Sequence, residues 1–159
     1  MDKLIFGLTL VAALGSGLIA GLFFVFSNTI MKALGRLSAA EGIASMNSIN
    51  VVIINPLFLG VFLGTGAVCA LLIVSSLLRW QNPGSFYLIA GAAIYLIGSL
   101  VVTMVFNVPL NKALAAAAPT DADLWASYLS NWTFWNHVRT VASLASAALL
   151  TIALVYVAK

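Results

Sequence analysis

The stretch 131–139 gathers several side chains that could do chemistry: Trp132, Trp135, Asn136, His137 and Arg139. An arginine with an amide neighbour can hold an anionic oxygen. An imidazole is the conventional side-chain base at neutral pH, and His137 is the only histidine in the chain. Tryptophan rings offer flat apolar walls to an aromatic ligand. The stretch therefore predicts a site for a flat molecule that carries an anionic oxygen.

Helical periodicity adds members to this site. If 125–146 is one helix, about 100° per residue puts six side chains on one stripe: Trp125, Tyr128, Trp132, Asn136, Arg139 and Ser143. His137 points away from that stripe. We expect the stripe to face the interior of the protein.

The same residues also have plain structural explanations. Arg139 could extend to lipid headgroups, and Trp125, Trp132 and Trp135 could form an interfacial belt. His137 could equally be a capping or interfacial residue. For Arg139 we favour the functional interpretation, because an arginine near a membrane span is costly and is a functional-site hypothesis by default.

Four asparagines are expected near the same membrane edge as Arg139: Asn50, Asn107, Asn111 and Asn136. A single asparagine is more often a helix cap or a turn former. Four of them at one depth, together with an arginine, are typical of donors arranged around a carbonyl or an enolate.

Composition indicates the elements that must position these residues. Of 159 residues, 63% are apolar and 7% are charged, whereas a soluble domain carries about 25% charged residues. Four stretches have the length and apolarity of a membrane span. We predict an all-α transmembrane four-helix bundle, one integral membrane domain over 1–159, with spans at about 4–30, 51–78, 86–106 and 136–158.

The two long connections, 31–50 and 107–140, are predicted to contain short interfacial helices. Ser38 and Glu41 fit a capping box, and Asp121 or Asp123 can cap the last helix. Four spans place both termini on one side of the membrane and both long connections on the other. The positive residues are divided too evenly between the two sides to fix the orientation.

Local signals within the spans give three further predictions. Pro56 should loosen a turn early in the second span, and Pro109 should interrupt or restart the third helix. The spacings Gly17 to Gly21 and Gly60 to Gly64 are typical of helices that pack closely in lipid.

A weak internal repeat gives one interpretation of the bundle as a duplicated helical hairpin. Residues 26–34 align with 106–114 at Phe, Lys, Ala and Leu. This arrangement would set Asn50 opposite Arg139 across a shared cavity. Chance is the other explanation, since the chain is rich in alanine and leucine.

Several function classes are disfavoured. The single cysteine, Cys69, cannot form a disulfide or a thiolate cluster within one chain. One histidine excludes a bis-histidine haem within one protomer, and a metal site lacks enough ligands. The sequence has no run of basic residues of the kind that would suggest nucleic-acid binding. A metal or haem held between copies of a homo-oligomer stays open.

Four motifs follow one another over nearly the whole chain: Ala20-Gly21-x-x-Phe24-x-Phe26-Ser27, Met46-x-x-x-Asn50, Asn107-x-Pro109-Leu110-Asn111 and Trp132-x-x-x-Asn136-His137-x-Arg139. Their order resembles the anthrone oxygenase-like family of small four-helix membrane proteins, many of them bacterial. The resemblance implies oxidation of an anthrone-type lipophile by molecular oxygen without a cofactor. It also implies location in the inner membrane of a bacterium.

The resemblance implies roles for named residues. The expected catalytic set holds an enolate or anthranolate and removes its proton: Arg139, Asn136, Asn107, Asn111 and His137. The substrate could instead lose its proton to water, with no protein base. The expected substrate-binding set surrounds the rings: Trp132, Trp135, Asn50, Phe24, Ser27, Met46 and Trp125.

Three other interpretations stay open. The protein could be a non-catalytic binder or carrier of lipophilic aromatic molecules. It could be a metal- or haem-dependent redox protein assembled across an oligomer. It could also be a structural subunit of a larger membrane complex.

Overall fold

The computed structural model describes residues 3–78, 80–82 and 84–157, and every regular element in this part is helical. The α-helical elements are α1 (Lys3–Val25), α2 (Met31–Leu34), α3 (Ala39–Val52), α4 (Pro56–Leu77), α5 (Ser85–Tyr95), α6 (Val108–Ala116) and α7 (Ala122–Val157). Three π-helical segments join some of them: η1 (Phe26–Ile30), η2 (Leu96–Val101) and η3 (Thr103–Asn107).

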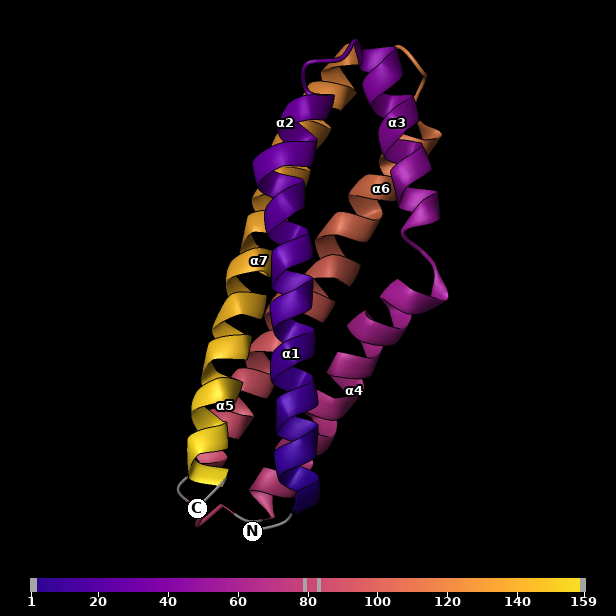
Figure 1. The fold of residues 1–159 in the computed structure, drawn as a ribbon. Helices are drawn as coiled ribbons and strands as arrows, with labels where there is room; N and C mark the ends of the chain where they lie inside the picture. The colour runs from indigo at the N-terminus through magenta and orange to yellow at the C-terminus, as the bar shows by residue number, and fades with distance from the viewer. Residues whose placement is uncertain (1–2, 79, 83, 158–159) are drawn as a thin grey trace.

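These elements form four helical columns. Three run the length of the molecule and the fourth, α4, runs along only part of it (Figure 1). Each column is long and apolar enough to cross a membrane: Lys3–Leu34, Pro56–Leu77, Ser85–Ala116 and Ala122–Tyr156. This confirms the predicted all-α fold with four candidate membrane spans. Both ends of the chain lie at the bottom of Figure 1, whereas α2, α3 and the start of α7 lie at the top.

Polar side chains define where the helices begin. Ser38 and Glu41 form the predicted capping box at the start of α3, and Asp121 Oδ1 accepts from Leu124 N at 2.9 Å at the start of α7. The prediction for Pro56 was wrong. Asn55 is the N-cap of α4 and Pro56 occupies its first turn, where the missing N–H costs nothing, so the second span begins there and not at 51.

The other three columns extend beyond the predicted spans on the upper side. The first column continues through η1 and α2 to Leu34, and α7 begins at Ala122. The third column continues past Phe106 to Ala116, with η3 directly before the turn that contains Pro109. Pro109 therefore lies in the first turn of α6, directly after the π-helical segment η3. The column changes from π- to α-helical geometry at this point but is not interrupted.

The length of α4 sets the level of the bilayer. Its 22 residues span about 33 Å, close to the ~30 Å thickness of bilayer hydrocarbon. With 36 residues, α7 is about 54 Å long and extends roughly 20 Å further. The rings of Phe23 and Phe62 are 6.2 Å apart, and α4 begins about six residues, or about 9 Å, above Phe62. If α4 is the span that crosses the hydrocarbon, the upper edge of the hydrocarbon falls near residue 29.

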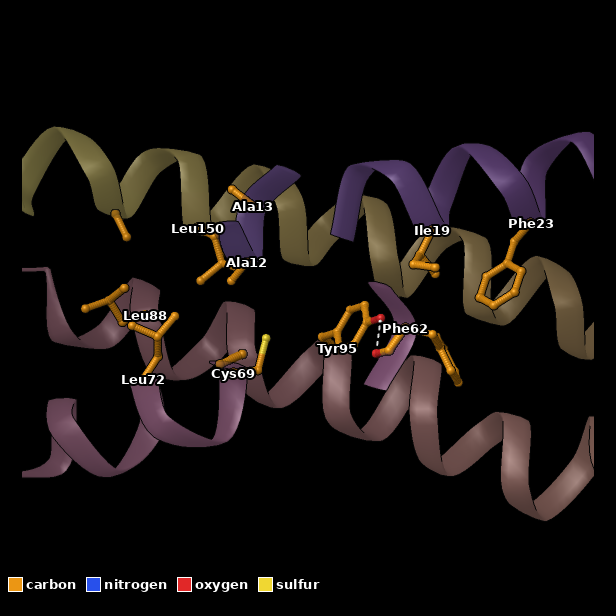
Figure 2. Packing of buried hydrophobic residues seen from close by; sticks show 12 residues of the cluster. Ala12, Ala13, Ile19, Phe23, Phe62, Cys69, Leu72, Leu88, Tyr95 and Leu150 are labelled. Atoms are coloured by element: carbon orange, nitrogen blue, oxygen red, sulfur yellow. Dashed lines mark hydrogen bonds between the residues drawn. The ribbon is translucent and has the colours of Figure 1, made fainter. Parts of the chain in front are cut away.

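Two separate cores fill the molecule. The lower bundle comprises α4, α5, η2 and the parts of α1 and α7 beside them. Figure 2 shows its buried cluster, in which small and aliphatic side chains pack with the rings of Phe23, Phe62 and Tyr95. The upper lobe comprises η1, α2, α3, α6 and the first half of α7. Its buried cluster contains three aromatic residues of α7: Trp125, Tyr128 and Trp132.

Close helix approach does not occur where the glycine spacings predicted it. A side chain at Gly17, Gly21, Gly60 or Gly64 would meet nothing within 4 Å, so these glycines face outward. Other glycines allow the close contacts, because a side chain at Gly42 would collide with the Trp125 ring and one at Gly98 with Ala142. These contacts bring α3 and the third column against α7.

Candidate functional site

The predicted stripe of α7 faces the protein interior. Its six members are all buried: Trp125, Tyr128, Trp132, Asn136, Arg139 and Ser143. Since α7 is one uninterrupted helix over this range, the 3.6-residue period is maintained from the aromatic core of the upper lobe down into the bilayer. The stripe thus supplies one wall of a buried polar region between the two cores. This region, called the layer below, includes the side chains of Asn107, Asn136 and Arg139.

Arg139 is the centre of this layer. Its side chain is 5% exposed. Nη2 donates to Asn136 Oδ1 at 2.6 Å, and Nη1 donates to Thr103 Oγ1 at 3.2 Å. The guanidinium carbon lies 4.1 Å from the ring centroid of Phe23 and 5.1 Å from that of Trp132. The cation is therefore held by neutral oxygens and by the negative faces of aromatic rings.

Asn136 connects Arg139 to the first column. Its Nδ2 donates to Phe23 O at 2.6 Å and to Ser27 Oγ at 2.5 Å. These bonds fix the amide so that its oxygen faces Arg139. Ser27, predicted as a substrate-binding residue, therefore reaches the layer through Asn136.

A second network lies above Arg139. Asn111 Oδ1 accepts from both Tyr128 Oη and Trp132 Nε1, each at 2.9 Å. Tyr128 is also close enough to Asn50 and Arg139 to interact electrostatically with both. Asn50 and Asn111 thus lie near Tyr128, whereas Asn136 bonds Arg139. The placement of Asn50 opposite Arg139 stays a prediction.

Four buried polar atoms of this region have no hydrogen-bond partner in the described part of the chain. They are Arg139 Nε, Asn107 Oδ1, Asn50 Nδ2 and Asn47 Oδ1. The other end of the Asn107 amide is anchored, because Nδ2 donates to Trp132 O at 3.2 Å. A buried polar atom without a partner costs about 1–3 kcal/mol. Arg139 Nε and Asn107 Oδ1 therefore give the layer one donor and one acceptor without a described partner.

No carboxylate balances the charge of Arg139 among residues 3–78, 80–82 and 84–157. Its partners in this part of the chain are an amide, a hydroxyl and two rings. Within the same ranges, no three His, Cys, Asp or Glu side chains come together as a metal site would require. The charge of the guanidinium is thus available to an anion.

Three predicted site residues lie outside the layer. Phe24 is 54% exposed on the outer side of α1, because the helix turns Phe23 toward Arg139 instead. Trp135 is half-buried and stacks on Phe106, with ring centroids 3.5 Å apart. His137 is exposed on the outer side of α7, as its position off the stripe indicated.

The remaining predicted residues belong to the upper lobe. Met46 and Trp125 are buried in its aromatic core. Trp125 stacks on Tyr128 with ring centroids 5.8 Å apart, so it supports the layer from above and does not contact Arg139.

Sequence reasoning missed Phe23 and Thr103, and it did not assign a role to Tyr128. Thr103 and Asn107 lie in η3, and Ser27 lies in η1. Such π segments occur often at functional sites. The buried side of α1 repeats at three- and four-residue spacing through Ser16 and Ala20 to Phe23, and that period was the signal that could have identified Phe23.

Two grooves open on the outside of the molecule near the layer. The larger, named the outer groove below, has a volume of about 670 Å³ and lies between η1–α2 and α7. It is lined by Ser27, Asn28, Met31, Lys32, Ala126, Leu129, Ser130, Thr133, Phe134 and His137. The smaller, of about 360 Å³, lies beside Phe106 and Trp135.

Comparison with known proteins gives one match. Residues 58–149 match the sequence model of a family described as anthrone oxygenase, which covers more than half of the chain. The matched range contains Asn107, Asn111, Trp132, Asn136 and Arg139. No curated protein and no solved structure matches the chain.

Proposed function

Because the chain belongs to the anthrone oxygenase family, we propose that it oxidises a flat phenolic or anthrone-type lipophile with molecular oxygen. The reaction passes through an enolate or anthranolate held by Arg139 and the neighbouring amides. The observation that carries this proposal is the buried guanidinium, whose described partners are all neutral. A cation at membrane depth is costly when uncompensated, so an anionic intermediate gains stabilisation there that it lacks in water.

The reaction balances with substrate and oxygen alone. An anthrone loses a proton from its methylene carbon to give an anthranolate. This anion passes one electron to oxygen, and the resulting radical and superoxide combine to form a carbon–oxygen bond. The peroxide regains a proton and loses water as the second methylene hydrogen leaves. One oxygen atom stays as the quinone carbonyl, and the substrate anion itself serves as the reductant.

Arg139 Nε is the first donor assigned to the oxyanion, because it is buried and unpartnered. Asn50 Nδ2, which lies near Tyr128, is assigned as the second donor. Donors that are already in place stabilise a developing charge without reorganisation. Asn107 Oδ1 is the acceptor available for a hydroxyl group of the same substrate. Asn136 and Thr103 are positioning residues, since they hold the guanidinium and not the substrate.

We assign water, and not His137, as the base that accepts the first proton. His137 lies on the outer side of α7 and lines the outer groove, whereas Arg139 faces the interior. The layer lies just below the upper edge of the hydrocarbon, so a proton has a short path to water. Stabilisation of the anion by Arg139 then makes the substrate more acidic and supplies the driving force for its ionisation.

Trp132 and Phe23 are proposed to flank the bound rings and to exclude bulk water. Both already cover the guanidinium, and both are buried. Exclusion of water strengthens the attraction between the cation and the anion. It also supports the choice of a lipophilic substrate that arrives from the bilayer.

The test follows oxygen uptake and quinone absorbance with purified protein, an anthrone and aerated buffer. Arg139→Met should lower the rate above the spontaneous reaction about 100-fold or more, the usual effect of losing an oxyanion donor. Lys112→Met removes an exposed cation and should leave the rate unchanged. Equal rates for wild type and Arg139→Met would contradict the proposal.

The same preparation separates the alternatives. A protein that binds the anthrone but does not accelerate its oxidation would be a binder or carrier. Stoichiometric haem or metal in the active preparation would instead support a redox protein assembled with a cofactor.

A further inference from the structure

We propose that the outer groove binds the phosphate headgroup of an anionic phospholipid. This site is separate from the buried layer in which the substrate is proposed to react. The groove opens outward between η1–α2 and α7, whereas Arg139 faces inward. The inference rests on the level, charge and polarity of the residues that line the groove.

The groove lies at the level where headgroups occur. The start of α4 places the upper edge of the hydrocarbon near residue 29. Ser27 lies just below this level and Lys32 just above it, and both line the groove. A lipid whose acyl chains lie beside the bundle would therefore bring its headgroup to the groove.

The groove carries positive charge without negative charge. Lys32 is its one permanently charged lining residue, and no aspartate or glutamate lines it. Lys32 Nζ donates to Asn28 Oδ1 at 3.3 Å, which holds the ammonium over the groove with two of its three hydrogens free. A lysine near the membrane surface strengthens the attraction of anionic lipid about fivefold.

Hydroxyl groups supply further donors for phosphate oxygens. Ser130 and Thr133 face the groove from α7. They are three residues apart and so lie on the same side of the helix. Phosphate oxygens accept such hydrogen bonds strongly.

The surface below the groove is apolar, as acyl chains require. Phe134 lines the lower part of the groove and is 59% exposed. On the same side of α7, Val141 and Leu144 continue toward the centre of the bilayer and are 68% and 62% exposed. From Lys32 through the hydroxyl groups and His137 to the exposed apolar side chains below them, the polarity follows that of a phospholipid in the upper leaflet.

The test titrates detergent-purified full-length protein with phosphatidylglycerol and with phosphatidylcholine of identical acyl chains, using native mass spectrometry. Wild type should bind phosphatidylglycerol more tightly. Lys32→Gln should weaken that binding about fivefold and leave phosphatidylcholine unaffected. Lys112→Gln removes an exposed cation outside the groove and serves as the matched control. Thermal unfolding of both variants should match wild type, because both lysines are exposed.

Three results would overturn the proposal. Wild type could bind both lipids equally, or Lys112→Gln could weaken phosphatidylglycerol binding as much as Lys32→Gln does. Inorganic phosphate, tested as a separate arm, could compete at concentrations comparable to the lipid, which would identify a site for free phosphate. Thr133→Val is a second variant, expected to weaken phosphatidylglycerol binding by the loss of one hydroxyl donor.

Discussion

In the lower bundle, deeply buried polar groups find partners within the protein. Tyr95 Oη donates to Phe62 O at 3.0 Å, as the dashed line in Figure 2 marks, and the hydroxyls of Ser16 and Ser146 are 3.2 Å apart. In the layer below the upper lobe, Arg139 Nε and Asn107 Oδ1 have no described partner. Ser76 Oγ, near the lower end of α4, is the exception in the bundle. Polar groups of the bundle thus join helices, whereas the layer combines such links with polar atoms that have no described partner.

The apolar cores of the two regions also differ in the arrangement of their rings. The lower core packs Ala12, Leu72 and Leu150 with three rings, Phe23, Phe62 and Tyr95, which meet edge to face. The upper core contains a row of α7 rings, in which Trp125 stacks on Tyr128 and Tyr128 on Trp132. Rings held in this way form rigid flat surfaces at low entropic cost. One region therefore supports the fold, and the other presents planar walls beside a cation.

Charge neutralisation within the layer should have the largest effect. Thr103→Asp would place a carboxylate where Thr103 Oγ1 now accepts from Arg139 Nη1, giving the guanidinium a counter-ion. Turnover of an anthrone should fall about 100-fold, because the cation would no longer attract the substrate anion. Thr103→Asn has the same shape without the charge and should keep most of the activity. Equal losses in the two variants would contradict the role assigned to the charge.

Two asparagines separate the roles of the two regions. Asn50 Nδ2 is assigned to the oxyanion, so Asn50→Ala should lower turnover about tenfold, the value of one hydrogen bond to an anion, with little loss of stability. Asn55 caps α4, and Asn55→Ala should lower the free energy of unfolding by about 1 kcal/mol with unchanged turnover. Rates and thermal unfolding of both variants, measured side by side, check this pair. If Asn55→Ala lowered turnover and Asn50→Ala lowered only stability, the ligand role assigned to Asn50 would be wrong.

A smaller effect is expected in the lower bundle. Tyr95→Phe removes the hydrogen bond to Phe62 O and should lower the free energy of unfolding by about 1 kcal/mol. The rate per folded molecule should not change, because Tyr95 belongs to the lower core. Thermal unfolding and anthrone oxidation measure the two quantities. A large loss of rate would show that the two regions are not independent.

The smallest effect concerns the start of α3 in the upper lobe. Hydrogen bonds from Ser38 lower the pKa of Glu41 below its ordinary value of 4.5. The ionised carboxylate therefore stabilises α3 fully above about pH 4.5, and this contribution is lost as pH falls through the lowered pKa. Glu41→Gln should remove this part of the acid sensitivity. Unfolding curves near neutral pH and at about pH 3 compare the variant with wild type, and identical pH dependence would exclude the effect.

Much of the fold could be predicted from the sequence because its signals are local. Charge-free stretches identify membrane spans, and Ser38 with Glu41 identifies a helix start. The stripe of α7 was predictable because one uninterrupted helix keeps its period from Trp125 to Ser143. The start of α4 was misplaced, since Asn55 and Pro56 suit both a loosened turn and a new helix, and only the separate helix α3 decides between them.

The rest of the site depends on how helices are rotated against one another. The choice between Phe23 and Phe24 depends on which side of α1 faces α7, and the Phe24 motif alone does not reveal it. Trp135 was placed in the site because it is close to Arg139 in sequence, yet Phe106 of the third column holds it outside. The unpartnered atoms of Asn50 and Asn107 follow from packing between distant segments, so no sequence pattern could have identified them.

The most direct test of the central claim measures the ionisation of a bound phenol. Absorbance titration of a naphthol bound to the protein under anaerobic conditions separates anion stabilisation from turnover. If Arg139 holds an oxyanion, the pKa of the bound naphthol should be lower in wild type than in Arg139→Met by about one unit or more, equivalent to about 1.4 kcal/mol. Equal pKa values for the naphthol bound to the two proteins would contradict the account.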